Sequence, residues 1–279
     1  MKKLFTYLMV IPLAFLTNCS DDDDNTIVIG PTGETKTYQL GSVADPSISG
    51  TATFIENSDA STTIELQLTG TPDGGMHPAH IHFGDAIDAG EIALTLGTVD
   101  GTTGSSSITK STLDDGTSIS YDELINFDGY INVHLSSDDL GTLVAQGLIG
   151  ENELINSMSY PLNTVDIDGI SGMVTFSERV NGEILSVIDL DGTTEGGLHP
   201  AHIHSGSAEN PDMSPNIIVD LSPVVGETGL SYTNITMLND NTPLSYSDIL
   251  TIDGYVNVHL SADDLATLAA QGNVGANAN

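Results

Sequence analysis

The sequence predicts an all-β protein: two tandem antiparallel β-sandwich or barrel domains with short helices. Three observations lead to this prediction. Short segments in which apolar and polar residues alternate recur along the chain, separated by Gly, Asn and Asp turn residues, as is typical of antiparallel strands. The chain also repeats itself at an offset of 122 to 125 residues. Hydrophobic residues make up 39% of the 279 residues, which argues against disorder and suffices for a core in each copy.

The first 18 residues have the features of a secretory signal peptide. Lys2 and Lys3 precede an apolar run over residues 4–16, and a basic start followed by a short apolar stretch is the usual signal pattern. A membrane-spanning helix needs about 20 apolar residues, so a retained helix is not expected. Cys19, the only cysteine, follows where a bacterial lipobox carries its acylated residue. We predict lipidation at Cys19; an incidental cysteine is the alternative.

Residues 19–34 are predicted to form the acylated cysteine and an acidic tether. The run Ser20-Asp21-Asp22-Asp23-Asp24 resembles the Ser-acidic tether of Bacteroidetes-type lipoproteins. This resemblance implies an outer-membrane lipoprotein that is anchored by its lipid and exposed on the cell surface; a solvated acidic linker is the alternative. Because the one cysteine is assigned to the lipid, no disulfide is expected in the mature chain, and stability must come from burial.

The net charge of −34 limits the classes of partner. Loss of Lys2 and Lys3 with the signal peptide would leave Lys36, Lys110 and Arg179 against 39 acidic residues. Such a field repels nucleic acid and anionic substrates and attracts cations. A nucleic-acid-binding role is therefore excluded, and metal ions are the expected small partners.

Two blocks define the internal repeat. Gly74–His82 recurs as Gly196–His204, and Asp128–Gly147 recurs as Asp253–Gly272 with 16 of 20 positions identical. The second copy has three additional residues in the loop around 210–215. We place domain 1 at residues 35–156 and domain 2 at residues 157–279.

The expected elements follow from local patterns. Strands are predicted at residues 51–55, 63–68, 91–96, 130–135 and 217–221, where alternating or short apolar segments stand between turn residues. A single helical turn is expected to begin at Ser120. A further helix is expected at 136–147, because Ser136 resembles an N-cap followed by acidic residues and an apolar face.

All eight histidines belong to the two repeated blocks, and this exclusivity is the strongest functional signal in the sequence. Side chains at i and i+2 of a strand point to the same face. We therefore expect copy one to project His80 and His82 from one face and Ala79, Ile81 and Phe83 from the opposite, core-facing side. The histidines are His77, His80, His82 and His134 in copy one, and His199, His202, His204 and His259 in copy two.

The second block supplies a matching face. His134 shares its side of the predicted strand with Tyr130 and Asn132. His77 precedes Pro78, which favours an extended or turn conformation and is expected to let the ring reach over the same patch. If the two strands are neighbours, three or four imidazoles converge outside the core. The opposite, apolar face of the strand consists of Ile131, Val133 and Leu135.

Converging neutral imidazoles favour a transition metal, with copper or zinc the expected cofactor. A three-histidine site would leave an open coordination position, whereas a four-histidine site would be closed or tetragonal and copper-like. Asn132 and Asn257 are predicted to orient a ligand. A structural histidine network and a site for another ligand or partner remain the alternatives.

Calcium is the weaker prediction. The acidic pairs include Asp114-Asp115, Asp138-Asp139 and Asp263-Asp264, but none has the spacing of an EF-hand loop. The second and third pairs are instead expected in the first turn of a helix, where acidic side chains are favourable.

The blocks Gly74–His82 and Gly129–His134, together with their copies, resemble the CHRD domain family. Its hallmark is a Gly-x-His-x-x-His-Ile-His stretch followed downstream by Tyr-Val-Asn-Val-His, and the resemblance covers nearly all of residues 35–279. It implies a β-sandwich or barrel domain, common in bacterial secreted proteins, whose molecular function is poorly defined. Many members end this block with a Gly-Glu-Ile-Arg-Gly-Gln strand, which the present chain lacks, so its final strand is in question.

The His-x-His strand also resembles the copper-binding strand of copper/zinc superoxide dismutases, whose ligands likewise face away from the barrel core. The expected domain is therefore immunoglobulin-like or superoxide-dismutase-like. Superoxide chemistry is not carried over, because that enzyme steers an anion with positive charge and no basic residue lies near a histidine block here.

Three functions follow in order of preference. The first is a non-enzymatic surface lipoprotein in which each domain holds a metal for scavenging or for stabilising the fold. The second is an adhesion or interaction module for an extracellular protein partner, with structural histidines and two displayed domains. The third is a metalloenzyme with an open three-histidine site, which would need a general base that the sequence does not identify.

Overall fold

The computed structural model describes residues 30–209 and 216–278. The predicted signal peptide, Cys19, most of the acidic tether and the longer loop at 210–215 lie outside the described residues. In the part of the chain that is described, no helix is both long and apolar enough to cross a membrane.

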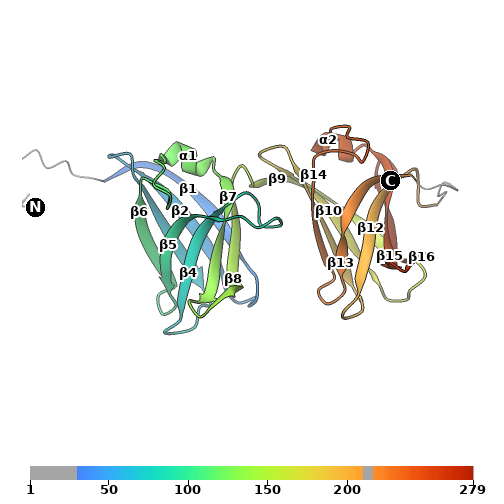
Figure 1. Cartoon of the computed structure of the whole chain (residues 1–279), viewed down its shortest axis with the longest axis horizontal. Coiled ribbons are helices and arrows are strands. Elements are labelled where there is room, and N and C mark those ends of the chain that lie inside the picture. Colours follow the sequence, from blue (N-terminus) through green and yellow to red (C-terminus); the bar gives the residue numbers. More distant parts are fainter. Residues whose placement is uncertain (1–29, 210–215, 279) are drawn as a thin grey trace, which may run out of the picture.

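The first copy folds as a closed barrel of eight antiparallel strands, which confirms the predicted all-β class (Figure 1). Around the barrel the order is β1-β2-β3-β6-β5-β4-β7-β8. The strands are β1 (Pro31–Ser42), β2 (Ser49–Asn57), β3 (Thr62–Thr69), β4 (Met76–Phe83), β5 (Ile92–Asp100), β6 (Ser105–Lys110), β7 (Asp128–Ser136) and β8 (Asp139–Gly150).

The second copy repeats this barrel. Its order, β10-β11-β14-β13-β12-β15-β16-β9, is closed by pairing of its first and last strands, as in the first copy. The strands are β9 (Leu154–Thr164), β10 (Ser171–Arg179), β11 (Ile184–Asp191), β12 (Leu198–Ser205), β13 (Ile217–Val225), β14 (Leu230–Ile235), β15 (Asp253–Ser261) and β16 (Asp264–Gly275).

Each barrel has one short helix, and both helices lie at the same end of their barrels (Figure 1). The helix α1 (Tyr121–Ile125) begins where the sequence predicts a helical turn, with Ser120 and Glu123 forming a capping box. In α2 (Tyr246–Ile249) Ser245 caps the first turn in the same way. These side chains satisfy backbone N–H groups that have no partner within a helix.

The helix predicted at 136–147 is wrong. These residues form the β7–β8 hairpin and most of β8, and Ser136 pairs with Asp139 across the turn. Asp139 accepts a hydrogen bond from the backbone N–H of Thr142 at 3.0 Å. Ser and Asp bond to nearby N–H groups in tight turns as well as at helix starts, so the pattern did not distinguish the two. Asp264 occupies the same turn in copy two, and the final strand questioned above is therefore present in both copies.

The core fills each barrel from the inward faces of its strands. Ala79, Ile81 and Val133 are fully buried there, as the alternation predicts. Phe83 and Leu135, which were also expected to face the core, are 40% and 41% exposed. Both stand near the end of their strand, and the β7–β8 register shifts between His134 and Ser136, which breaks the alternation before Leu135.

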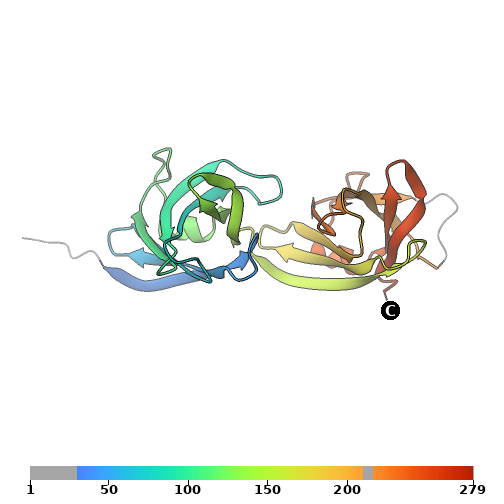
Figure 2. The ribbon, with the colours of Figure 1, turned by 90° about the horizontal axis from the view of Figure 1, so that it is seen from below.

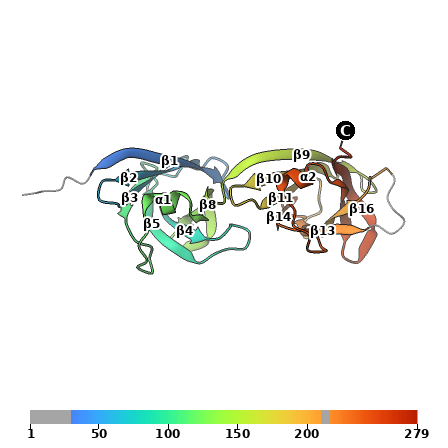
Figure 3. The same cartoon turned by 90° about the horizontal axis from the view of Figure 1, so that it is seen from above.

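The two barrels meet around one buried arginine. Arg179, at the end of β10, is 1% exposed. Its guanidinium donates to the side-chain oxygen of Asn152 at 3.0 Å and to that of Asn234 at 3.1 Å. The nearby carboxylate of Asp85, in the first barrel, partly compensates the buried charge. Figures 2 and 3 show β1 and β9 following one another along the same side of the molecule.

Asn152 connects this arginine to the first barrel. Its side-chain amide donates to the carbonyl of Gly84 at 2.9 Å and to the carboxylate of Asp128 at 2.7 Å. Asn277 makes the corresponding bonds in the second barrel, to Gly206 and Asp253. Because the chain's one arginine, Arg179, bonds to Asn152, a comparison of the two asparagines reports the contribution of the junction.

We therefore expect Asn152→Ala to destabilise the protein more than Asn277→Ala. Both variants lose the internal bonds, but Asn152→Ala also removes an acceptor from a buried charge, which adds about 1–3 kcal/mol to the loss of unfolding free energy. Urea unfolding of the two variants measures this difference. Equal losses would show that Arg179 does not depend on Asn152.

Candidate metal centres

Each barrel brings three histidines together on its outer surface. In copy one, β4 pairs with β7 so that Ala79 faces Val133 and His80 faces Asn132. Because these residues alternate with the core positions, the imidazoles of His80 and His82 project outward beside that of His134. One ligand nitrogen from each of the three rings lies within 4.8 Å of the others. The predicted meeting of two distant sequence segments is confirmed.

The second barrel forms the same group from β12 and β15. Ala201 faces Val258 and His202 faces Asn257 in the register of this strand pair. A ligand nitrogen from each of His202, His204 and His259 again lies within 4.8 Å of the others. We call these groups trio 1 (His80, His82, His134) and trio 2 (His202, His204, His259).

Backbone carbonyls fix the ring nitrogens of trio 1. Nδ1 of His82 lies 2.9 Å from the carbonyl oxygen of Gly90, and Nδ1 of His134 lies 2.7 Å from that of Leu140. A carbonyl only accepts hydrogen bonds, so each Nδ1 carries the proton and each Nε2 keeps its lone pair. Nε2 of His134 lies 3.1 Å from Nδ1 of His80. Two ligands at about 2.0–2.1 Å from a tetrahedral ion stand at a similar separation.

Trio 2 contains more nitrogens without a partner. Nδ1 of His259 donates to the carbonyl of Leu265 at 2.8 Å, as in trio 1. Nδ1 of His202 and both nitrogens of His204 are buried and have no hydrogen-bond partner among the described residues. Buried polar atoms are nearly always paired, so unpaired ring nitrogens in three histidines that converge within 4.8 Å are suited to holding a metal ion.

Burial keeps most of these rings neutral. Desolvation is the largest cause that lowers the pKa of His80, His134, His202 and His259, with neighbouring imidazoles adding to the effect in several of them. For His204 desolvation, followed by repulsion from His202 and His259, lowers the pKa to about 4. A neutral imidazole is the form that binds a metal.

Stacked tyrosines hold the central ring of each trio. Tyr130 stacks on His82 with ring centroids 5.0 Å apart, and Tyr255 stacks on His204 at 5.2 Å. The alternation of β7 indicated that Tyr130 shares the face of the histidines, but it could not indicate a parallel ring contact. The accepting carbonyls of Gly90, Leu140 and Leu265 had no signal in the sequence, because every residue carries a carbonyl.

His77 and His199 do not belong to the trios, although all eight histidines were predicted as ligands. His77 is 1% exposed, and its Nδ1 donates to the backbone carbonyl of His134 at 3.2 Å. His199 makes the same contact with His259. The reason is strand parity: Pro78 lies within regular β4, so His77 points to the same side as Ala79. These two histidines support the backbone of a trio member instead.

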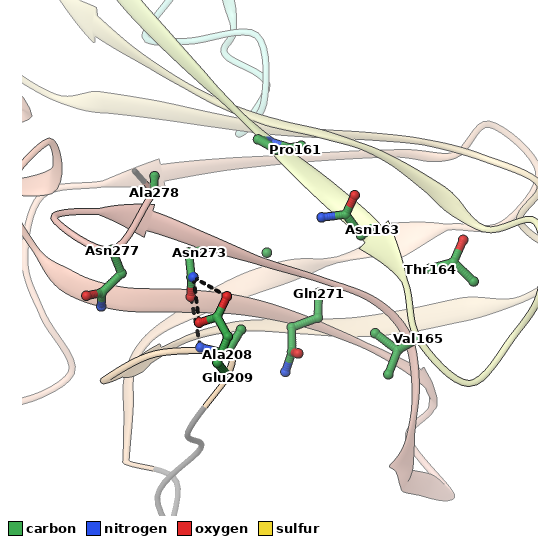
Figure 4. A pocket seen from close by; sticks show the side chains of 11 residues that line it. Pro161, Asn163, Thr164, Val165, Ala208, Glu209, Gln271, Asn273, Asn277 and Ala278 are labelled. Carbon is green, nitrogen blue, oxygen red and sulfur yellow. Dashed lines mark hydrogen bonds between the residues drawn. The ribbon is translucent and has the colours of Figure 1, made fainter.

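The asparagines predicted to orient a ligand have another partner. The side-chain oxygen of Asn132 accepts a hydrogen bond from Gln146 at 2.9 Å, and that of Asn257 accepts one from Gln271 at 2.8 Å. Gln271 also lines a cavity of about 420 Å³ between β9 and β16 (Figure 4). That cavity is lined by amides and small side chains together with Glu209, which bonds to Asn273. It contains no histidine.

Within the described ranges, the groups of histidine, cysteine and acidic residues that could hold a metal are the two trios. The acidic pairs considered for calcium make local contacts. Asp114 accepts hydrogen bonds from Thr95, and Asp115 accepts one from the backbone of Thr117. Asp139 and Asp264 act in hairpin turns, not in helices as the sequence analysis expected.

The low pKa of His204 predicts a pH dependence of the metal-free protein. In the unfolded chain His204 has an ordinary pKa near 6.5, whereas in the folded protein its pKa is about 4. Between these two pH values the unfolded state therefore binds a proton at His204 and the folded state does not. The wild type should therefore lose stability relative to His204→Gln as the pH falls from 6.5 to 4, by up to about 3 kcal/mol. Urea unfolding in chelator at several pH values measures this. A difference that stays constant with pH would contradict the assignment.

Comparisons with family models, curated proteins and solved structures found no match to this chain. The function must therefore be argued from its own side chains. The chain folds into two β-barrels, and each barrel carries a group of three histidines whose geometry can hold a metal ion.

Proposed function

We propose that this protein is a non-enzymatic cell-surface lipoprotein whose two barrels each bind one transition metal ion, copper or zinc. Trio 1 and trio 2 supply the ligands, and the bound ion serves scavenging or stabilises the fold. The observation that carries the proposal is the duplicated group of three converging imidazoles, in which His82, His202 and His204 have buried nitrogens without a hydrogen-bond partner among the described residues. The lipid anchor at Cys19 and membership of the CHRD family are parts of the proposal that rest on sequence resemblance.

The chemistry of the donors supports copper or zinc. Neutral imidazoles are ligands of intermediate softness that suit copper and zinc, whereas calcium and magnesium prefer oxygen ligands. Three nitrogens leave one position open for water or an exchangeable ligand. The net charge of −34 raises the local concentration of cations around the barrels. A scavenging protein benefits from both features, because the ion must arrive quickly and must also be able to leave.

A second candidate, an extracellular interaction module, is supported by exposed apolar side chains at equivalent positions of the two copies. Met76 and Leu198 are 57% and 60% exposed, and Leu140 and Leu265 are 51% and 50% exposed. Leu140 and Leu265 also accept the proton of a trio histidine through their carbonyls. Leu140 and Leu265 therefore border the histidine trios, where a partner would contact both the apolar side chains and the trio.

Metal content tests the proposal. Purified protein, stripped by chelator, loaded with zinc or copper at neutral pH and dialysed, should retain two ions per chain. The variant His80→Ala/His82→Ala should retain one, and adding His202→Ala/His204→Ala should remove the second. Each pair of changes removes two of three ligands from one barrel and leaves the other intact.

Asp138→Asn/Asp263→Asn provides the control, because it removes two exposed charges near the trios without touching an imidazole. This variant should still retain two ions. The proposal fails if the wild type retains no metal, or if the histidine variants retain as much metal as the acidic control. Normal folding and partner binding in chelator, with no metal retained, would favour the interaction module.

A further inference from the structure

An acidic residue is placed near the first histidine of each trio. The second barrel supplies it from strand β13 and the first barrel from the loop after β6. In trio 2, His202 lies opposite Asp220 of the neighbouring strand β13. Nε2 of His202 is 3.9 Å from Oδ1 of Asp220. The other ring nitrogen, Nδ1, is buried without a partner. His202 therefore has one nitrogen free for the metal centre and the other facing an acid.

In trio 1 the position opposite His80 is Thr95, on β5. Thr95 cannot supply a charge, but it holds one: its backbone N–H and its hydroxyl donate to Oδ2 of Asp114 at 2.9 and 2.6 Å. Through Thr95, Asp114 is held beside the strand position that lies opposite His80. The other carboxylate oxygen of Asp114 is 3.8 Å from Lys110.

The acid and the neutral side chain that bonds to it have exchanged places between equivalent positions of the two copies. Thr95 corresponds to Asp220, and Asp114 corresponds to Asn239, both at the offset of 125. The backbone N–H of Asp114 bonds to Ala93, and that of Asn239 bonds to Ile218, which are also equivalent. In copy two Asn239 donates to Asp220 at 3.1 Å. Each barrel thus has one acid in this pair and a neutral side chain that hydrogen-bonds to it.

We propose that Asp114 and Asp220 are positioning residues for the metal centres, each placed to accept the proton of its histidine's distal nitrogen when an ion binds, so that Nδ1 is presented to the ion. This inference rests on the proposed function. The ring has two nitrogens, and an acid can only accept from a nitrogen that carries the proton. An acid at Nε2 therefore selects the tautomer whose Nδ1 lone pair is free for the metal.

The arrangement completes the control of proton positions in trio 1. His82 and His134 have their Nδ1 protons fixed by carbonyls and bind through Nε2. Without an ion, Nδ1 of His80 donates to Nε2 of His134. A bound ion takes the Nδ1 lone pair instead, so the proton of His80 moves to Nε2 and needs an acceptor there. The carboxylate is partly exposed, so its effect is modest without metal. The hydrogen bond from the distal N–H to the carboxylate becomes stronger when a bound cation makes that N–H more acidic.

The test uses trio 1 in a full chain whose trio 2 is disabled by His202→Ala/His204→Ala. In this parent, Asp114→Asn should weaken zinc binding by about 10–100-fold, as expected for loss of a ligand's hydrogen-bonded acid. Adding Thr95→Asp to Asp114→Asn rebuilds the copy-two arrangement and should restore the affinity. Competition with a chromophoric chelator measures the affinity, and the visible spectrum of the copper-loaded protein reports the ligand geometry.

Asp115→Asn is the matched control. It removes one negative charge at the residue next to Asp114, from a side chain that accepts a hydrogen bond from Thr117 within its own turn. It should leave both the affinity and the copper spectrum close to those of the parent. Urea unfolding of the metal-free variants separates a general loss of stability from a loss of positioning.

The inference is overturned if Asp114→Asn binds zinc as well as Asp115→Asn does, or if Thr95→Asp fails to restore a reduced affinity while the metal-free protein stays folded. A parent that binds no zinc would overturn the proposed function as well, and this result is distinguishable from the other two because it appears before any acid is changed.

Discussion

The two histidine trios depend on the antiparallel pairing of β4 with β7, and of β12 with β15. In this register Ala79 meets Val133 and Ala201 meets Val258 inside the barrels, and the strand period of two then places the histidines together outside. A shift of one residue in either strand would move the imidazoles to the core face and the apolar residues to solvent. Burial of the core therefore fixes the relative positions of ligands that are more than 50 residues apart in the sequence. The metal centre needs no flexible loop to assemble it.

The same packing makes the imidazoles available for a metal. Partial burial keeps the rings neutral, and carbonyls at the hairpins and loops hold their protons on the side away from the centre. Unpaired buried nitrogens cost stability, so two copies that retain them at equivalent positions carry a feature that folding alone does not favour. The acids Asp114 and Asp220 fit the same account, because a carboxylate is present in both barrels although it comes from the loop after β6 in one and from β13 in the other.

Strand alternation, the repeat and the grouping of histidines could all be predicted from the sequence, because they depend on local periodicity and on which residue types recur. The errors arose where one local pattern fits two structures. Ser136 with its acidic neighbours fits a helix start and a hairpin turn equally well, and only the pairing of β7 with β8 decides between them. His77 was assigned to the metal because Pro78 was expected to let its ring reach over the histidine patch, whereas its parity along β4 directs it to the other face. The carbonyl acceptors, Asp220 opposite His202 and the buried Arg179 depend on contacts between distant segments, which a pattern along the chain does not contain.

X-ray absorption spectroscopy of the protein loaded with two equivalents of zinc tests the central claim most directly. The account predicts three imidazoles around each ion, with nitrogens at about 2.0–2.1 Å and multiple scattering from their rings, and an oxygen such as that of water in the remaining position. A spectrum dominated by oxygen, with fewer than two imidazoles per ion, would mean that the ions sit on the acidic surface. The trios would then not be metal centres.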